Sequence, residues 1–318
     1  MPAVVDTQQL PTTTHRVPLL ASSMAFGAGL VWSLGALMAR LAGETDAWQY
    51  LIWRSIGVVV VMEFLARARR RPPLLPIAYG SGRLMLLACG ALLLASVAFV
   101  YALKNTTAAN AAFLASITPL IAVVLARVFI GERLTRVTIG GIALALVGLL
   151  VMVTADLGAG NMAGNIAALF SSLGFAAYTV CIRSGPERDW SPVLPGYASM
   201  MIVLCAVVTI LNGKPLVPPV ADTIYALIHG GLLIVVGTIL FNVASRTVPA
   251  VAMTIFAQSE TVFVPIWIFL WFSERPKPAT LVGGAIILAA VLGKAMLDAR
   301  PGPLDHPQVP EPGPGSIA

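Results

Sequence analysis

Charged residues are scarce in this chain. Of its 318 residues, 11% are charged and 58% are hydrophobic, whereas ordinary soluble domains have about 25% charged and about 45–50% apolar residues. A water-soluble fold of this length cannot bury so much apolar surface, so the composition indicates that lipid surrounds most of the chain. The basic residues behind the formal charge of +6 are scattered in short clusters, so we expect no nucleic-acid partner.

Several chemical signatures are also missing. The three cysteines, Cys89, Cys181 and Cys205, lie far apart inside apolar runs, which excludes a metal-ligand spacing or a disulfide framework and favours simple packing. The sequence has no GxxxxGK[ST] loop, no HExxH pattern and no GxSxG turn. It therefore predicts no nucleotide hydrolysis, no enzyme activity of these kinds, and no metal ion or cofactor.

The apolar residues gather in runs long enough to cross a bilayer. A spanning helix needs about 20 mostly apolar residues, and ten runs of this kind lie at 17–41, 48–66, 84–103, 107–128, 137–155, 163–183, 195–212, 223–244, 249–272 and 279–298. Residues 1–16 are polar, and no small-residue cleavage site follows a short apolar core, so the first run is expected to be a retained span. Segments 1–16 and 301–318 are expected to be disordered. The predicted fold is an all-α membrane protein with ten transmembrane helices.

Two stretches of the chain, 99–132 and 241–274, repeat one another at a spacing of about 142 positions. Matched residues include Phe99 with Phe241, Lys104 with Arg246, Ala108 with Ala250, and Glu132 with Glu274, and further upstream Trp32 with Phe175 and Arg40 with Arg183. Many membrane transporters are built from two such halves. We therefore expect a first five-helix repeat over 17–155 and a second over 163–298.

The basic residues predict the direction of the spans. Those in alternate joints and span ends form a larger set, Arg16, Arg67, Arg69, Arg70, Arg71, Arg83, Arg127, Arg133, Arg136, Arg183, Arg188, Arg246 and Arg300, and a smaller set, Arg40, Lys104, Lys214, Arg275 and Lys277. Cytoplasmic loops are enriched in Lys and Arg, so both termini are predicted to be cytoplasmic. With five spans in each half, the second half enters the membrane upside down, and such inverted repeats place a binding site near the midplane.

Glu260 is the first candidate for that site. It falls near the middle of the ninth span, where a charged side chain costs at least about 2.5–3.5 kcal/mol. Its repeat mate is Thr118, directly before Pro119, which is expected to kink the fourth helix and act as a hinge. Two interpretations are open: either Thr118, Pro119, Gln258, Ser259 and Glu260 line a polar cavity, or Glu260 is a neutral, hydrogen-bonded packing residue.

Three other polar residues lie within spans. Arg54 could hold an anionic group of a substrate, pair with a carboxylate, or cap a helix end. His229 could relay protons or contact substrate, or be satisfied within the packing. Asn242 could donate to a substrate or join neighbouring helices.

Aromatic residues suggest a wall for a ligand. Trp32 and Phe175 are repeat mates near the middle of the first and sixth spans, whereas interfacial anchors lie near span ends. They are therefore candidates to form the wall of a site that binds an amphipathic or aromatic ligand. Tyr178 on the sixth span is a further candidate.

Several short motifs follow one another in a recognisable order. They are Leu30-Val31-Trp32-Ser33, Arg54, Tyr101-Ala102-Leu103-Lys104, Ile117-Thr118-Pro119-Leu120, Gly131-Glu132-Arg133-Leu134, Phe175-Ala176-Ala177-Tyr178 and Phe241-Asn242. Over residues 18–298 the sequence resembles the EamA-type, ten-helix branch of the drug/metabolite transporter superfamily. Within it, bacterial inner-membrane exporters of amino acids, including aromatic amino acids, are most similar. The resemblance implies export or exchange of small metabolites through a central cavity by alternating access.

The sequence therefore predicts a secondary transporter that exports amino acids or similar small molecules, with the bilayer and a small-molecule substrate as partners. An exporter of drugs or quaternary cations is an alternative, because Glu260 beside aromatic walls suits a cation. A membrane-embedded lipid-modifying enzyme is a second alternative, although it would need polar residues near one interface. Proton coupling and the choice between monomer and homodimer are left open.

Overall fold

The computed structural model describes residues 19–129, 131, 136–156, 162–185, 187–244 and 259–298, and every regular element in these ranges is helical. The helices of the first half are α1 (Leu19–Leu41), α2 (Ala47–Ala68), α3 (Leu74–Gly80), α4 (Arg83–Asn105), α5 (Ala108–Ala115), α6 (Thr118–Phe129) and α7 (Arg136–Asp156). Those of the second half are α8 (Met162–Arg183), α9 (Val193–Leu211), α10 (Val220–Ile228), the π-helix η1 (His229–Ile234), α11 (Val235–Ala244), α13 (Ser259–Phe272) and α14 (Pro278–Asp298). The predicted all-helical fold is confirmed.

Each of the ten expected spans falls mainly on helix in its described residues. By length and composition, six helical segments could cross a membrane: Ser23–Leu41, Arg83–Asn105, Ala108–Phe129, Met162–Ile182, Val193–Leu211 and Val220–Phe241. Three shorter apolar segments are Ile139–Val151, Ser259–Phe272 and Pro278–Gly293. The structure therefore confirms a membrane fold, while the number of ten spans stays a prediction.

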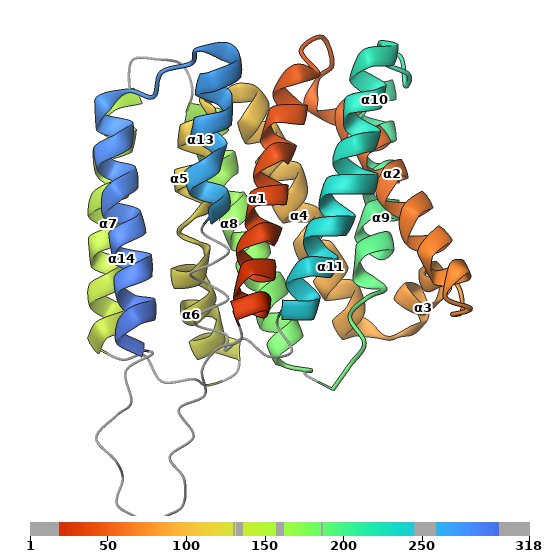
Figure 1. Ribbon diagram of the computed structural model, residues 1–318, viewed down its shortest axis with the longest axis horizontal. Helices are drawn as coiled ribbons and strands as arrows, with labels where there is room; N and C mark the ends of the chain where they lie inside the picture. Colours follow the sequence, from red (N-terminus) through yellow and green to blue (C-terminus); the bar gives the residue numbers. More distant parts are fainter. Residues whose placement is uncertain are drawn as a thin grey trace, which may run out of the picture.

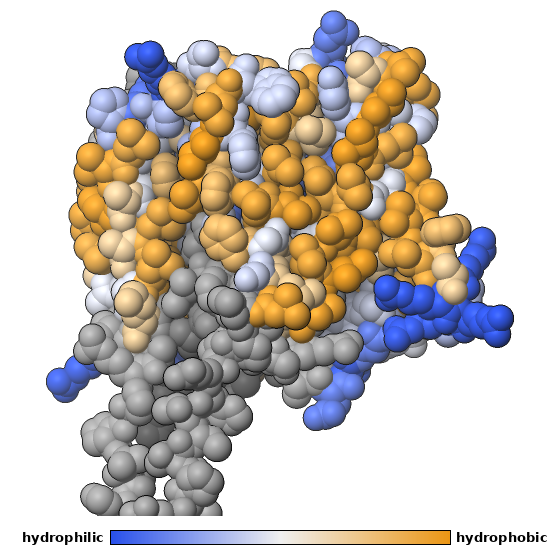
Figure 2. Space-filling view, in the orientation of Figure 1, coloured by the Kyte–Doolittle hydropathy of each residue, from blue (hydrophilic) through white to orange (hydrophobic). Residues whose placement is uncertain are grey.

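The outer surface of the bundle suits lipid. Figure 2 shows apolar side chains over the middle of the face in view, with hydrophilic side chains gathered towards the upper and lower ends. Large apolar residues such as Phe129 and Leu211 are 75% and 80% exposed. In water such a surface would drive association, whereas in a bilayer it contacts acyl chains.

The first helices of the two halves run in opposite directions. Arg40, in the last turn of α1, donates to the carbonyl oxygen of Thr106 at 2.5 Å. The Thr106 hydroxyl donates to Asn165, in the first turn of α8, at 2.8 Å. The end of α1 and the start of α8 therefore lie at the same end of the bundle, at the top in Figure 1. This is the arrangement that an inverted repeat predicts.

The fourth span, Ala108–Phe129, changes its hydrogen bonding just before Pro119, where the sequence predicts a kink. It is interrupted before Pro119: α5 ends at Ala115, and α6 begins at Thr118. The Thr118 hydroxyl donates to the Ala115 carbonyl oxygen at 2.7 Å. Proline disfavours a helical residue before it and lacks an N–H, but it fits the first turn of a new helix. Two turn residues, Ser116 and Ile117, therefore separate α5 from α6, and Pro119 lies in the first turn of α6.

The last helices of the halves, α7 and α14, pack side by side at one edge of the bundle (Figure 1). Gly148 of α7 permits this contact, because a Cβ atom there would lie 2.6 Å from the carbonyl oxygen of Gly283 and 2.9 Å from Ile287. Gly284 likewise faces the ring of Phe113 in α5. Small residues thus let the two helix backbones approach closely.

Substitutions of two glycines in α7 separate this packing role from helix propensity. We expect Gly148→Ala to destabilise the protein by about 1–3 kcal/mol, the usual cost of overpacking. Gly140→Ala is the matched control, because a Cβ at Gly140 would meet nothing within 4 Å, and alanine favours a helix over glycine by about 0.5–1 kcal/mol. Thermal melting in detergent should show a lower melting temperature for the first variant only. Equal melting temperatures would contradict close packing at Gly148.

Candidate functional site

Trp32 joins the first helix to the second half of the chain. Its indole lies 5.4 Å from the ring of Phe241 in α11, measured between ring centroids. A side chain at Gly237, one turn earlier in α11, would overlap the indole. Trp32 is therefore held in a slot that glycine provides at the interface between the two halves.

Helix α13 is attached to α1 by polar and aromatic contacts. The indole N–H of Trp267 donates to the Ser33 hydroxyl at 2.9 Å, and the Ser259 hydroxyl donates to the carbonyl oxygen of Phe26 at 3.1 Å. Phe263 stacks on Trp267 and meets Phe26 edge-on, with centroids 5.8 and 5.9 Å apart. Ser259, a predicted site residue, thus holds α13 against α1.

Glu260 and Thr118, the repeat mates, occupy similar places. Glu260 lies in the first turn of α13 and is half-buried, and Thr118 begins α6 and is also half-buried. Gln258 lies outside the described residues. Asn242 belongs to α11, but its side chain lies outside the described part of the structure.

The aromatic candidates form two separate pairs. Phe175 and Tyr178 of α8 have ring centroids 5.7 Å apart, and Phe175 is 42% exposed. Helix α8 packs mainly against α4, whereas Trp32 pairs with Phe241. Among the described residues, ring contacts therefore do not join the repeat mates Trp32 and Phe175 directly, and a shared aromatic wall stays a prediction.

A second polar group lies deep between α2, α4 and η1. The hydroxyl of Tyr50 and Nδ1 of His229 are 2.8 Å apart, and both side chains are buried. Arg54, one turn further along α2, is only 3% exposed and donates from Nη2 to the hydroxyl of Ser96 in α4. The buried Nε of Arg54 has no hydrogen-bond partner.

Glycines bring α2 and η1 together at this level. A Cβ atom on Gly230 would overlap the carbonyl group of Arg54, and one on Gly57 would lie 2.8 Å from the carbonyl oxygen of Leu227. π-Helical turns are rare and occur often at functional sites. Of this group, Arg54 and His229 were predicted from the sequence, whereas Tyr50 and Ser96 were not. The sequence could have pointed to Tyr50, because Tyr50 precedes Arg54 by four residues and therefore shares its helix face. It gives no such indication for Ser96.

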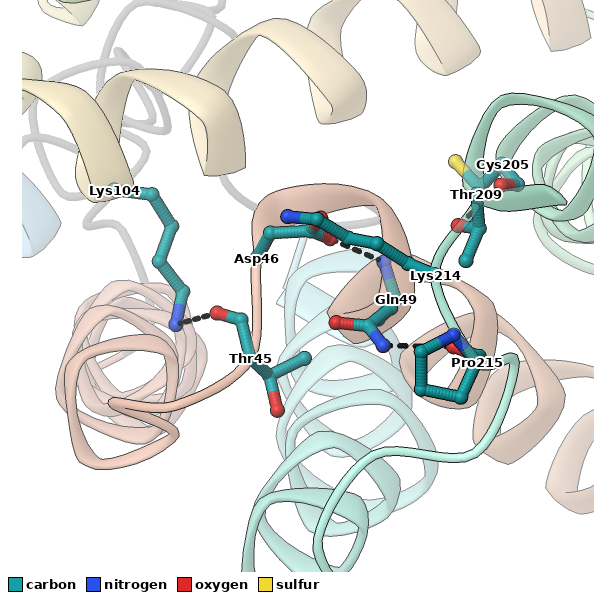
Figure 3. Close-up of polar contacts among 8 residues, drawn as sticks. All are labelled: Thr45, Asp46, Gln49, Lys104, Cys205, Thr209, Lys214 and Pro215. Atoms are coloured by element: carbon teal, nitrogen blue, oxygen red, sulfur yellow. Dashed lines mark hydrogen bonds and ion pairs between the residues drawn. The ribbon is translucent and has the colours of Figure 1, made fainter. Parts of the chain in front are cut away.

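At the upper end of the bundle, α1 and α4 cap one another. Lys104, in the last turn of α4, donates to the carbonyl oxygens of Ala42 and Thr45, which follow α1. Arg40, in the last turn of α1, donates to the carbonyl of Thr106, the residue after α4. Basic side chains near helix C-termini form hydrogen bonds with the terminal carbonyl oxygens. Their positive charge also interacts favourably with the negative end of the helix dipole. Figure 3 shows Lys104 reaching Thr45.

Contacts between the halves continue around this end. Arg40 lies 3.7 Å from a carboxylate oxygen of Glu274, whose other oxygen accepts from the backbone N–H of Ala108 at 3.2 Å. Lys214 pairs with Asp46 at 2.8 Å (Figure 3). This end is therefore closed by partners drawn from both halves.

A cavity of about 680 Å³ opens beside these contacts. Its walls include the side chains of Glu44, Asp46, Trp48, Tyr101, Lys104 and Lys214. A second cavity, of about 470 Å³, lies among apolar side chains of α6, α7 and α8. The larger of these two cavities thus lies at the end of the bundle, and the cavity expected at the depth of Glu260 stays a prediction.

Comparison with known proteins agrees with a transporter fold. Residues 19–154 and residues 162–294 each match the sequence model of the EamA-like transporter family. The pseudopaline exporter CntI of Pseudomonas aeruginosa is 25% identical over 265 residues, which cover 81% of this chain and 89% of that protein. A probable terminal-alkyne amino-acid exporter of Streptantibioticus cattleyicolor is 27% identical over 201 residues, 59% of this chain and 64% of that protein. A crystal structure at 21% identity shares the fold with a TM-score of 0.62, covering 88% of this chain and 99% of that one.

The ion pair between Arg40 and Glu274 should stabilise the closed end. Their side chains are 25% and 28% exposed, and each holds a second partner. In a double-mutant cycle of Arg40→Gln and Glu274→Gln, we expect a coupling energy of about 1 kcal/mol, the upper value for such pairs. The control cycle, Lys214→Gln with Asp46→Asn, should give less, because Lys214 is 50% exposed. Additive changes in melting temperature for the first pair would show that it contributes nothing.

Proposed function

Because this chain belongs to the EamA-like transporter family, we propose that it is a secondary transporter that exports amino acids or similar small metabolites across a bacterial inner membrane. The match of both halves to this family carries the proposal. The two exporters that it resembles support the substrate class, since one is a probable amino-acid exporter. Family and relatives are transporters, so the lipid-modifying enzyme is set aside.

The contacts between the halves support a rocking movement. Helix α1 meets α11 through Trp32 and α13 through Ser33, so it lies where two elements of the second half can move against it. The interrupted fourth span, with Pro119 in the first turn of α6, supports a hinge. Broken helices often form the binding sites of transporters, where their free backbone groups contact the substrate.

In the proposed site, Glu260 accepts the ammonium group of an amino acid, and Thr118 and Ser259 add polar contacts. Trp32, Phe175 and Tyr178 provide apolar walls, and Gln258 and Asn242 are further candidate contacts. The half-buried state of Glu260 and Thr118 supports access from a cavity.

The basic residues support a proposed orientation of the protein. Helix α1 begins, and α14 ends, at the lower end of the bundle in Figure 1, where α3 also lies. The segment Arg69-Arg70-Arg71 directly precedes α3. In the proposed orientation this end faces the cytoplasm by the positive-inside bias, and the end with Lys104 and Glu274 faces outwards.

An exporter of drugs or quaternary cations is the rival within the same superfamily. The aromatic residues around α1, together with Glu260, favour it, because a ring face attracts a cation. Counterflow into proteoliposomes with amino acids, nucleosides and quaternary amines separates the two. Exchange of amino acids supports the proposal, and exchange of quaternary amines alone would replace it with the rival.

Replacing Trp32 tests the position of the site. We expect Trp32→Ala to lower amino-acid counterflow at least about ten-fold, because it removes an aromatic contact and opens a gap beside Phe241. Trp271→Ala is the matched control, since Trp271 is 65% exposed on the outer face of α13 and should keep the wild-type rate. Glu260→Gln should also lose most of the exchange. Wild-type rates in both Trp32→Ala and Glu260→Gln would place the site elsewhere.

A further inference from the structure

Among the described residues, Arg54 is a cation without a counter-ion. No ion pair among them involves Arg54; the pairs of Arg40 with Glu274 and of Lys214 with Asp46 lie elsewhere. Its recorded hydrogen bond goes to Ser96, a neutral hydroxyl group, and its buried Nε has no partner. The guanidinium thus lies inside the bundle with a full charge and unused donor capacity.

Such an arrangement is costly for a protein that needs Arg54 only for packing. A buried ion without its partner costs several kcal/mol, and an apolar side chain of similar size avoids that cost. Ionisable residues inside membrane spans mark functional sites by default. The charge of Arg54 therefore suits a partner other than the described residues of the chain.

The surroundings of Arg54 hold it in place. From the facing elements, His229 of η1 bonds to Tyr50, and Ser96 of α4 accepts from Arg54. The close contact at Gly230 fixes the α2 backbone at Arg54. A guanidinium presents paired N–H donors that match the two oxygens of a carboxylate. A rigid guanidinium with free donors is thus prepared for a planar, two-oxygen anion.

A cavity at the upper end of the bundle lies near Arg54. The large cavity at the upper end includes Lys104 in its wall, and Nζ of Lys104 lies 5.4 Å from the centre of the Tyr50 ring. Tyr50 is one turn of α2 from Arg54. Along α2, Tyr50 therefore lies between Arg54 and the cavity residues Ala47 and Trp48, with Lys104 beside its ring, and displacement of Tyr50 and Lys104 would connect the cavity with Arg54.

We propose that Arg54 binds the carboxylate group of the transported molecule after it leaves Glu260, and that the upper cavity is its route to the outside. This rests on the proposed export function and adds a requirement that the substrate carry a carboxylate. The wall of the cavity carries two basic residues, Lys104 and Lys214, and two acidic residues, Glu44 and Asp46. A carboxylate bound through both of its oxygens supplies the negative charge that the guanidinium of Arg54 needs as a counter-ion.

Stability measurements test whether Arg54 is structural, and they need no substrate. We expect Arg54→Met to melt at the same temperature as wild type or higher, because it removes a buried unpaired charge while keeping an apolar side chain. Arg188→Met is the control, because Arg188 is exposed at the surface of the bundle and donates to the Ser81 carbonyl oxygen. A fall of several degrees for Arg54→Met, with binding unchanged, would show a structural role and overturn the proposal.

Binding measurements test the ligand chemistry. Leucine and phenylalanine are compared with leucinamide and phenylalaninamide as competitors of the exchanged substrate. We expect wild type to prefer each acid by at least about ten-fold, and Arg54→Gln to lose that preference, because bonds to charged groups are the strong ones. Arg54→Lys should keep part of it, and Ser96→Ala most of it.

The outcomes separate this proposal from the export function. If wild type exchanges amides as well as acids, or if Arg54→Gln keeps the acid preference, Arg54 is not the carboxylate anchor, although transport stands. If wild type exchanges only quaternary amines, both proposals fail. If Arg54→Met is too unstable to purify, the acid preference of Arg54→Gln and Arg54→Lys still decides the matter.

Discussion

The dry interior of the bilayer is the constraint on which this structure depends. Polar and charged groups there have no water to bond with and must find partners within the protein. The reciprocal capping of α1 and α4 meets this demand, because Lys104 and Arg40 each satisfy carbonyl oxygens beyond the other's helix. The hydroxyl of Thr118 does the same for the Ala115 carbonyl at the interruption of the fourth span. Among the described residues, Arg54 departs from this rule, because its charge has no counter-ion and its buried Nε has no partner.

The same constraint links the two halves. Polar partners such as Arg40 and Glu274 come from different halves, as do the aromatic partners Trp32 and Phe241. Apolar surfaces gain little from meeting each other in lipid, so hydrogen bonds, ion pairs and close packing at glycines determine which helices touch. Contacts of this kind are few and specific, and a small number of them must break for the halves to move apart at one end.

Several features of the site could be read from residue order. The repeat placed Thr118 and Glu260 in equivalent positions, and both lie in the first turn of a helix in the structure. Pro119 marked a disturbance of the fourth span, and the regular helix is interrupted just before it, at Ser116 and Ile117. The pairing of Tyr50 with His229 could not be read in this way, because the two residues are 179 positions apart. Neither could the place of Arg40 beside Glu274, which depends on how the end of α1 meets the segment that follows α13.

The sequence by itself determined that the chain is an all-helical membrane protein with a duplicated half, since helix length and hydropathy are local properties set by the lipid. The sequence also determined which charged residues lie inside apolar runs and therefore need a partner or a function within the membrane, because such charges are visible without coordinates. Only the tertiary structure decided which of these charges are neutralised. Partner choice depends on helix rotation and backbone separation, and glycines such as Gly230 and Gly237 set both through contacts between segments far apart in the chain.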